Sequence, residues 1–222
     1  MSAEPQWRVK TEPESRRPVF VAALVTIAGQ AWVAHSLRLS PFWLFPLIST
    51  VLLVASIAVY ESQDEPGRMA RALSFAFDAV LVAANAVSLV LLVRGVFLGS
   101  HLRPTGLLFA GLALWIVNVA VFALVYWELD GGGPEARADG YSEGYPDFVF
   151  PQQQADQQGL APAIWKPSFY DYLYVSLTSS IAFSPTDAMP YSKRAKLAMG
   201  VQNLLSFATL AVIVARAVNI AR

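Results

Sequence analysis

The chain has 222 residues, of which 55% are hydrophobic and only 14% are charged. A soluble domain usually carries about 25% charged residues, so this composition indicates a protein surrounded largely by lipid. Lys and Arg number 16 and Asp and Glu also number 16, and this balance argues against nucleic acid as a partner. The chain contains no cysteine and two distant histidines. Disulfides and thiol nucleophiles are therefore excluded, and we expect neither a metal nor a cofactor.

Five apolar runs are long enough to cross the roughly 30 Å hydrocarbon core of a bilayer as helices. In chain order they cover residues 19–37, 43–60, 70–97, 106–127 and 197–220. The polar, mixed-charge residues 1–18 precede them, and we interpret this segment as a disordered or surface-lying tail. The pattern predicts an all-α integral membrane protein with five transmembrane helices, located in the cell (inner) membrane.

Several polar side chains interrupt the apolar spans. In the third span, Asp78 and Asn85 share one helical face with Ser74 and Ser88, because their spacings fit the helical repeat. Asp78 has two interpretations, a proton or cation site and a structural hydrogen-bond acceptor for a neighbouring span. Asn118 in the fourth span and four residues of the fifth span also fit interhelical hydrogen bonds. The four are Gln202, Asn203, Ser206 and Thr209.

A polar loop rich in Gly and Pro, residues 128–167, follows the fourth span and is expected to lie outside the bilayer. Residues 168–183 then turn apolar again, but a helix of this length reaches only about 24 Å. Pro185 forbids its continuation. A short helix followed by irregular backbone is typical of a re-entrant segment, which is tolerated at membrane depth where protein or water surrounds it. We therefore expect a short re-entrant, pore-type helix and loop over residues 168–190, before the last span.

The last third of the chain resembles the pore module of tetrameric potassium-type, or pore-loop, ion channels. DYLYVSLT at residues 171–178 matches the pore helix, Asp187 and Pro190 match the residues after the filter, and Val214-Ala215-Arg216 matches the end of the inner helix. The whole chain also resembles an uncharacterised family of bacterial multi-span membrane proteins. The segments YWELDGGGP, DFVFPQ and AFSPTDAMP carry that second resemblance, which implies an architecture but no activity.

The apolar runs and the channel resemblance together divide the chain into three parts, and the resemblance, which does not cover the first three spans, implies a homotetramer around a central pore. Residues 1–18 would be the tail, residues 19–104 a three-span bundle, and residues 105–222 the pore-like module. Within the module, the resemblance implies an outer helix, a polar loop, a re-entrant helix with its loop, and an inner helix. These cover residues 106–127, 128–167, 168–190 and 194–220.

The filter region departs from the potassium-channel pattern T-V-G-Y-G-D. Counting back from Asp187, the chain has Ala182-Phe183-Ser184-Pro185-Thr186, so both glycines are replaced. A stack of main-chain carbonyls around the ion is therefore not expected. A candidate ring of hydroxyls remains, with Asp187 at its mouth, which would attract monovalent cations. The filter-like residues are Thr178, Ser179, Ser180, Ala182, Phe183, Ser184, Pro185, Thr186 and Asp187, and the candidate pore-lining residues are Asn203 and Ser206.

These features lead to two hypotheses. The first is a pore-loop membrane protein that acts as a weakly selective cation channel with a degenerate potassium-type filter. The second is a non-conducting membrane scaffold or accessory subunit, in which the loop 128–167 would bind a partner. An enzyme is not expected and no catalytic residue is assigned, because the chain has no Ser-His-Asp set, no HExxH motif and no phosphate-binding glycine loop. The filter region has a simpler alternative as a helix start, with Thr186 or Asp187 as the N-cap.

Two arguments about membrane orientation disagree. The channel resemblance puts the C-terminus inside and, with five spans, the N-terminus outside. That arrangement leaves 11 of the 16 Lys and Arg residues outside, so the positive-inside rule favours the reverse. We favour the charge rule, which a pore loop entering from the cytoplasm, as in glutamate-receptor channels, would reconcile with the resemblance.

Overall fold

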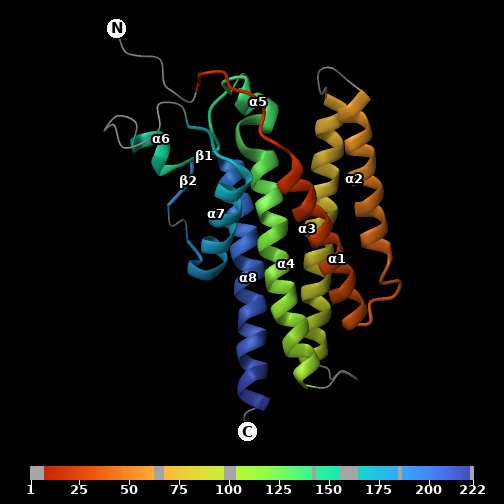
Figure 1. Cartoon of the computed structure of the whole chain (residues 1–222). Coiled ribbons are helices and arrows are strands. Elements are labelled where there is room, and N and C mark those ends of the chain that lie inside the picture. The colour runs from red at the N-terminus through yellow and green to blue at the C-terminus, as the bar shows by residue number, and fades with distance from the viewer. Residues whose placement is uncertain are drawn as a thin grey trace. The chain divides into compact units, whose positions relative to one another are not determined.

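The computed structural model describes residues 8–62, 68–97, 104–141, 144–155, 165–184 and 187–220. Most of these residues are helical, as Figure 1 shows, and the prediction of an all-α chain is confirmed. The long helices are α1 Arg17–Ser36, α2 Leu44–Ser62, α3 Arg68–Phe97, α4 Pro104–Leu129 and α8 Lys193–Ile220. The short elements are the 3-10 turn η2 Asp130–Gly132, α5 Pro134–Ala138, β1 Phe148–Val149, α6 Pro151–Ala155, α7 Phe169–Ala182 and β2 Met189–Pro190.

In the part of the chain that the structure describes, five helices are long and apolar enough to cross a membrane, as expected from the sequence. The protein therefore has the make-up of a multi-pass membrane protein. Four of these helices begin before the apolar runs, and three of the four begin at a basic residue, α1 at Arg17, α3 at Arg68 and α8 at Lys193. The apolar runs mark only the part of a helix that suits hydrocarbon, whereas Lys and Arg in a first turn belong to the membrane–water interface.

The chain forms two compact units. Unit 1 comprises Met1–Phe20 and Phe122–Asn203, and unit 2 comprises Val21–Val121 and Leu204–Arg222. Unit 2 is a bundle of the long helices, with all of α2 and α3 and the larger parts of α1, α4 and α8. Unit 1 contains the end of α4, the start of α8 and every short element between them.

Close approaches between helices hold unit 2 together. Its core is a cluster of aliphatic side chains from α1, α3 and α4. A Cβ atom on Gly29 of α1 would lie 2.6 Å from Val117 of α4, and one on Gly111 of α4 would lie 2.9 Å from Ile213 of α8. Small residues let transmembrane helices approach each other this closely. The resulting van der Waals contact matters because the hydrophobic effect does not drive helices together inside lipid. The core cluster is Val33, Leu89, Leu92, Leu107, Ala110 and Leu114.

Unit 1 is built around aromatic rings and one short β pairing. The ring of Phe148 lies 5.0 Å from that of Tyr126 and 6.3 Å from that of Tyr172, between centroids. β1 pairs with β2 in antiparallel fashion, with Phe148 opposite Pro190. Tyr126, Phe148 and Pro190 belong to the segments YWELDGGGP, DFVFPQ and AFSPTDAMP. Three segments that are separate in the sequence therefore meet in one unit.

Candidate functional site

The helix α7 is short and has well-defined ends. Ser168 and Asp171 form a capping box at its N-terminus, in which the Ser168 main-chain N–H donates to Asp171 Oδ2 at 2.8 Å. At its C-terminus Phe183 takes a left-handed conformation with φ 54° and donates its N–H to Ser179 O at 2.9 Å. The 14 residues between these ends reach about 21 Å. This helix is therefore shorter than the hydrocarbon core of a bilayer.

A buried glutamine of α8 holds the second half of α7. Gln202 Nε2 lies 2.7 Å from Ser176 Oγ, 2.9 Å from Ser176 O and 2.8 Å from Ser180 Oγ. On its other side, Gln202 Oε1 accepts a hydrogen bond from Tyr126 OH of α4. Gln202, Ser176 and Ser180 are all inaccessible to solvent. Because Gln202 comes nine residues after Lys193, the start of α8, this contact lies about 14 Å along α8.

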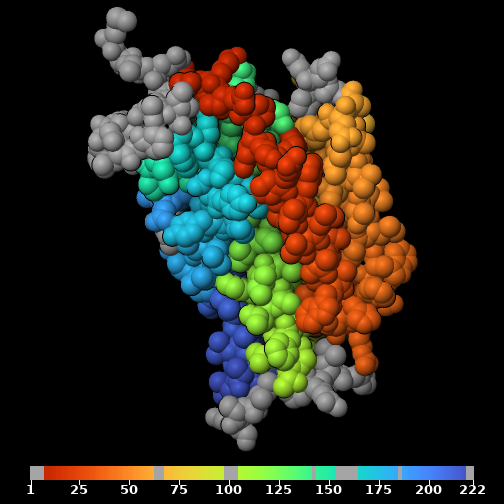
Figure 2. All heavy atoms as spheres, viewed as in Figure 1, coloured from red at the N-terminus to blue at the C-terminus, as the bar shows by residue number. Residues whose placement is uncertain are grey.

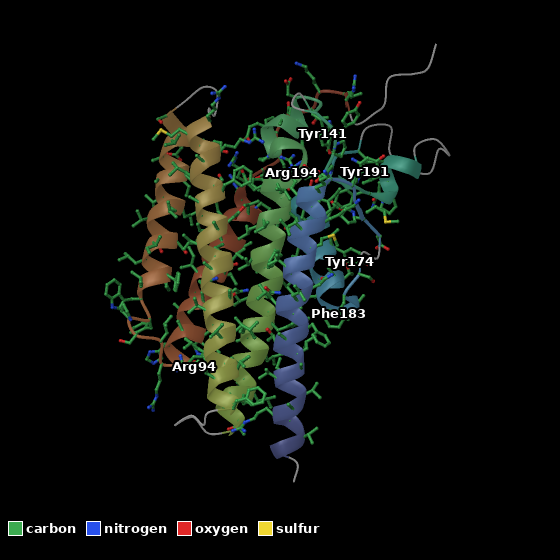
Figure 3. All side chains as sticks on the ribbon, turned by 180° about the vertical axis from the view of Figure 1, so that it is seen from behind. Arg94, Tyr141, Tyr174, Phe183, Tyr191 and Arg194 are labelled. Carbon is green, nitrogen blue, oxygen red and sulfur yellow. The ribbon has the colours of Figure 1, made fainter. Side chains whose placement is uncertain are left out.

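The two ends of the segment 168–190 lie at one end of unit 1. At the start of α7, Tyr172 OH donates to Asp130 Oδ2 of η2 at 2.5 Å. After α7, β2 pairs with β1, and Tyr191 donates its N–H to Asp147 O at 2.7 Å. Figure 1 shows α7 running alongside α8, and Figure 3 shows Tyr191 and Phe183 at opposite ends of this stretch. The segment 168–190 thus runs alongside α8 as far as Gln202. It then returns to the end of unit 1 at which it begins.

One face of α7 is not covered by the rest of unit 1. The exposed side chains recur at helical spacing, and all of them are apolar or aromatic. In the space-filling view, the cyan residues of α7 form part of the visible face of unit 1 (Figure 2). These exposed residues are Tyr170, Tyr174, Leu177 and Ile181. A stripe of this kind suits lipid or a neighbouring protein rather than water.

Two buried carboxylates connect η2 to the region before β1. Asp130 Oδ1 accepts the main-chain N–H groups of Asp147 at 2.6 Å and Phe148 at 3.1 Å. In return, Asp147 Oδ2 accepts the N–H of Gly131 at 2.8 Å. Gly131 has φ +60°, and a Cβ atom there would meet the Tyr141 ring at 2.3 Å, so this turn requires glycine. Residues that the sequence placed in a solvated loop are therefore buried and fully engaged as acceptors.

Two arginines neutralise these carboxylates. Arg194 of α8 forms a two-point ion pair with Asp147, at 2.6 Å and 2.5 Å. Burial raises the pKa of the Asp147 carboxyl, but hydrogen bonds from Arg194, Ser192 and Gly131 outweigh it and hold the pKa below its ordinary value. The buried Arg137 of α5 donates to the main-chain oxygens of Trp127 and Asp130 and lies 5.0 Å from the Tyr172 ring centroid. All four carboxylate oxygens of Asp130 and Asp147 accept hydrogen bonds, as buried polar groups of a structural site usually do.

Lys166 lies beside this cluster and is only half-buried. Its Nζ donates to Arg137 O at 2.8 Å and lies 5.0 Å from the Tyr141 ring centroid. Burial, and then the positive charge of Arg137, lowers the pKa of Lys166 to about 8. The lysine therefore loses its positive charge in the mildly basic range, well below the ordinary pKa of a lysine. Among the described residues, no three His, Asp or Glu side chains gather as a metal site would require.

The predicted filter-like residues fall into two groups. Ser179 and Ser180 are buried inside unit 1, and Thr178 Oγ1 donates to Tyr174 O of its own helix at 2.9 Å. The others that the structure describes are exposed, whereas Pro185 and Thr186 lie outside the described residues. The exposed ones are Ala182, Phe183, Ser184 and Asp187. The last helix starts after Ser192, whose Oγ accepts the N–H of Ala195 at 3.1 Å, so Ser192 provides the N-cap that Thr186 or Asp187 had been considered for.

The intramembrane polar residues of unit 2 form a chain of hydrogen bonds. Asn85 Nδ2 of α3 donates to Asn118 Oδ1 of α4 at 3.0 Å, and Asn118 Nδ2 donates to Ser206 Oγ of α8 at 2.8 Å. All three side chains are buried, as is Asp78, two turns before Asn85. Asn203 belongs to unit 1 and is only half-buried. This arrangement links three helices, as interhelical amide and hydroxyl groups typically do.

The contacts that hold α7 in place are only partly visible in the sequence. Ser168 and Asp171 have the spacing of a capping box, which could have marked the start of α7. Gln202 was noted only as one polar residue among several in the last span. No local pattern pointed to the contact of Arg137 with the Tyr172 ring, because the two residues lie far apart in the chain.

No protein-family model, no curated protein and no solved structure gives a significant match to the chain. The class that the fold defines is that of multi-pass α-helical membrane proteins. Beyond that class, the function has to be argued from the geometry of this chain.

Proposed function

We propose that the protein is a pore-loop protein of the cell inner membrane, in which the segment 168–190 enters and leaves the bilayer at the same face. The contact between Gln202 and Ser180 carries this proposal. It brings the C-terminal end of α7 beside α8 at about 14 Å from the start of α8. That distance is about half of the hydrocarbon thickness.

Two further observations support a re-entrant segment. The pairing of β1 with β2 brings the chain back after α7 to the end of unit 1 where η2 lies. The exposed stripe on α7 is apolar, which is costly in water and favourable in lipid or against another subunit. A helix that lay flat on an aqueous surface would present polar side chains on that face.

The proposed activity is weakly selective conduction of monovalent cations by a homotetramer. Four copies of the exposed loop after α7 would surround the axis, with Asp187 as a ring of carboxylates that attracts cations. Selectivity would be weak because Ser184 and Thr186 stand where glycines allow a carbonyl ladder. Asn203 is better suited than the buried Ser206 to face the path, because Ser206 already accepts a hydrogen bond from Asn118.

A non-conducting scaffold or accessory subunit is the second candidate. The observation that favours it is the inward direction of the α7 hydroxyls. Ser176 and Ser180 bind Gln202 within the same protomer, so they are not available to coordinate an ion on an axis. In this case the segment 168–190 would serve to shape a membrane-embedded surface for another protein.

Cation flux from purified protein in liposomes separates the two functions. We expect flux of K⁺ and Na⁺ from the wild type, a several-fold lower flux from Asp187→Asn, and wild-type flux from Asp139→Asn. Asp139 is a matched control, because it is also partly exposed and pairs with Lys10 away from α7. Absence of flux from a protein that is monodisperse in nanodiscs would favour the scaffold, and a monomer or dimer by native mass spectrometry would exclude the tetrameric pore.

A further inference from the structure

Residues 8–16 belong to unit 1 and contact its other segment, and we call them the N-terminal strap. Thr11 donates its main-chain N–H to Ala138 O of α5 at 2.8 Å, and Arg16 forms an ion pair with Glu135 of α5. The approach is close enough that a Cβ atom on Gly140 would lie 2.2 Å from Arg8 O. The strap is therefore part of the folded unit at several points along its length, although its composition is that of a polar tail.

Glu14 is the residue of the strap that reaches α7. Its Oε1 accepts the main-chain N–H of Phe169 at 2.8 Å, and its Oε2 accepts the indole N–H of Trp127 at 2.9 Å. Phe169 is the first residue of α7, and its N–H is one of those that a helix cannot satisfy internally. A carboxylate at this position also interacts favourably with the helix dipole. One side chain thus ties the first turn of α7 to the last turn of α4.

We infer that Glu14 is a positioning residue for the proposed pore segment, fixing the N-terminal end of α7 and thereby the placement of the loop after it. α7 is held at three levels, by Glu14 at Phe169, by Asp130 at Tyr172 and by Gln202 near its C-terminal end. A helix is stiff over this length, so a shift at its first turn moves its last turn as well. The inference rests on the proposed function only in its consequence for ion flux.

The helix does not need Glu14 in order to form. Ser168 and Asp171 already cap α7 locally, so its helicity is secured within its own sequence. Glu14 instead makes a contact across 155 residues of chain. Losing a contact of this kind changes where α7 lies, whereas losing the local cap would change whether it is helical.

The test compares Glu14→Gln with Glu12→Gln, which removes the same charge from an exposed position of the strap. The glutamine at position 14 can accept one hydrogen bond through its oxygen, but its NH₂ group cannot accept the other. Both changes are made with a spin label on Ser184→Cys, which is a unique cysteine because the chain has none. Label accessibility in nanodiscs reports the position of the loop, and liposome flux reports conduction.

We expect Glu14→Gln to change the accessibility of the label and to lower cation flux about fivefold, the effect of one average hydrogen bond. Glu12→Gln should leave both unchanged. Trp127→Phe removes the indole N–H but keeps an aromatic ring, so it should shift the label in the same direction and be non-additive with Glu14→Gln. It also serves as the test if Glu14→Gln is not monodisperse.

The two claims fail in different ways. A label that responds to Glu14→Gln in a protein without any flux supports the positioning role and overturns only the proposed conduction. A label that is unchanged by both Glu14→Gln and Trp127→Phe overturns the positioning role, whether or not the protein conducts.

Discussion

The carboxylate of Asp147 accepts two hydrogen bonds from the guanidinium of Arg194, at 2.6 Å from Nε and 2.5 Å from Nη2. Asp147 comes directly before β1, whereas Arg194 lies in the first turn of α8. The ion pair therefore joins the chain before α7 to the chain after it. The Asp147 side chain is 2% exposed and that of Arg194 is 50% exposed, so the carboxylate depends on the arginine for compensation of its charge.

Replacing Arg194 by Gln is expected to lower the free energy of unfolding by about 1–3 kcal/mol, because a buried carboxylate then loses its charged donors. Because Arg194 is half-exposed, we expect a decrease in the lower part of this range. Unfolding in mixed micelles, followed by tryptophan fluorescence, measures the change. Lys193→Gln at the neighbouring exposed position should change stability by less than about 0.5 kcal/mol. Equal effects of the two substitutions would show that the ion pair does not stabilise unit 1.

The lowered pKa of Lys166 predicts that the stability of the folded protein increases with pH. Burial, followed by the charge of Arg137, lowers its pKa in the folded protein from 10.5 to about 8. Between these values the unfolded chain binds more protons than the folded protein, so stability rises as pH rises through this window. We expect the melting temperature to increase from pH 7.5 to pH 9.5 in the wild type. The upper limit keeps the measurement below the ordinary pKa of tyrosine.

Lys166→Met should remove most of this increase, because its side chain keeps the contact with the Tyr141 ring but carries no proton. Lys196→Met, at an exposed position of α8, should retain the wild-type increase. A pH dependence that is the same in all three proteins would mean that Lys166 is not the group responsible.

Replacing Gln202 by Leu is expected to release α7 from α8. The substitution leaves Ser176 Oγ, Ser180 Oγ and Tyr126 OH without their shared partner. Each unsatisfied buried group lowers the free energy of unfolding by up to about 3 kcal/mol. Unfolding in mixed micelles measures the loss, and alkylation of a cysteine at position 184 measures the displacement of the loop. Thr209→Val is a suitable control, since Thr209 Oγ1 donates only to Leu205 O of its own helix at 2.7 Å. Unaltered alkylation in Gln202→Leu would mean that α7 is held by its other contacts.

Labelling from one side of the membrane tests whether the segment 168–190 is re-entrant. Tyr145 and Tyr191 are 70% and 72% exposed and lie on either side of α7 in the chain. Single cysteines at these positions should both react with a membrane-impermeant maleimide from the same side of sealed vesicles. Reaction from opposite sides would mean that α7 crosses the membrane. The side that reacts also determines the membrane orientation, for which the charge rule and the channel resemblance give opposite predictions.

The long helices could be predicted because lipid imposes the same requirement on every position of a span. Each residue of α3 or α4 must be apolar or paired, so the composition of a 20-residue window is enough to identify it. The start of α8 at Lys193 was less visible, because its first turn carries the charged residues of the interface. The existence of α7 was also predictable, since Pro185 limits it on one side and Ser168 on the other.

The contacts of unit 1 could not be predicted, because they join residues far apart in the chain. Acidic residues in a segment rich in Gly and Pro are usually solvated, and Asp130 and Asp147 had every local sign of such residues. They are buried because Tyr172, Arg194 and main-chain N–H groups from other elements satisfy them. The sequence around Glu14 does not indicate its contact with α7, since its partner Phe169 is 155 residues away.

The pairing of β1 with β2 closes a ring of chain from Phe148 to Pro190, with α7 inside that ring. This pairing is made by main-chain groups, and the side chains of α7, Gln202 and Glu14 take no part in it. Variants of α7, Gln202 or Glu14 can therefore change how far the ring extends, while its two strands stay adjacent. How far the segment between β1 and β2 extends and whether the two strands stay paired are therefore separate properties of this protein. A mutation can alter the first and leave the second intact.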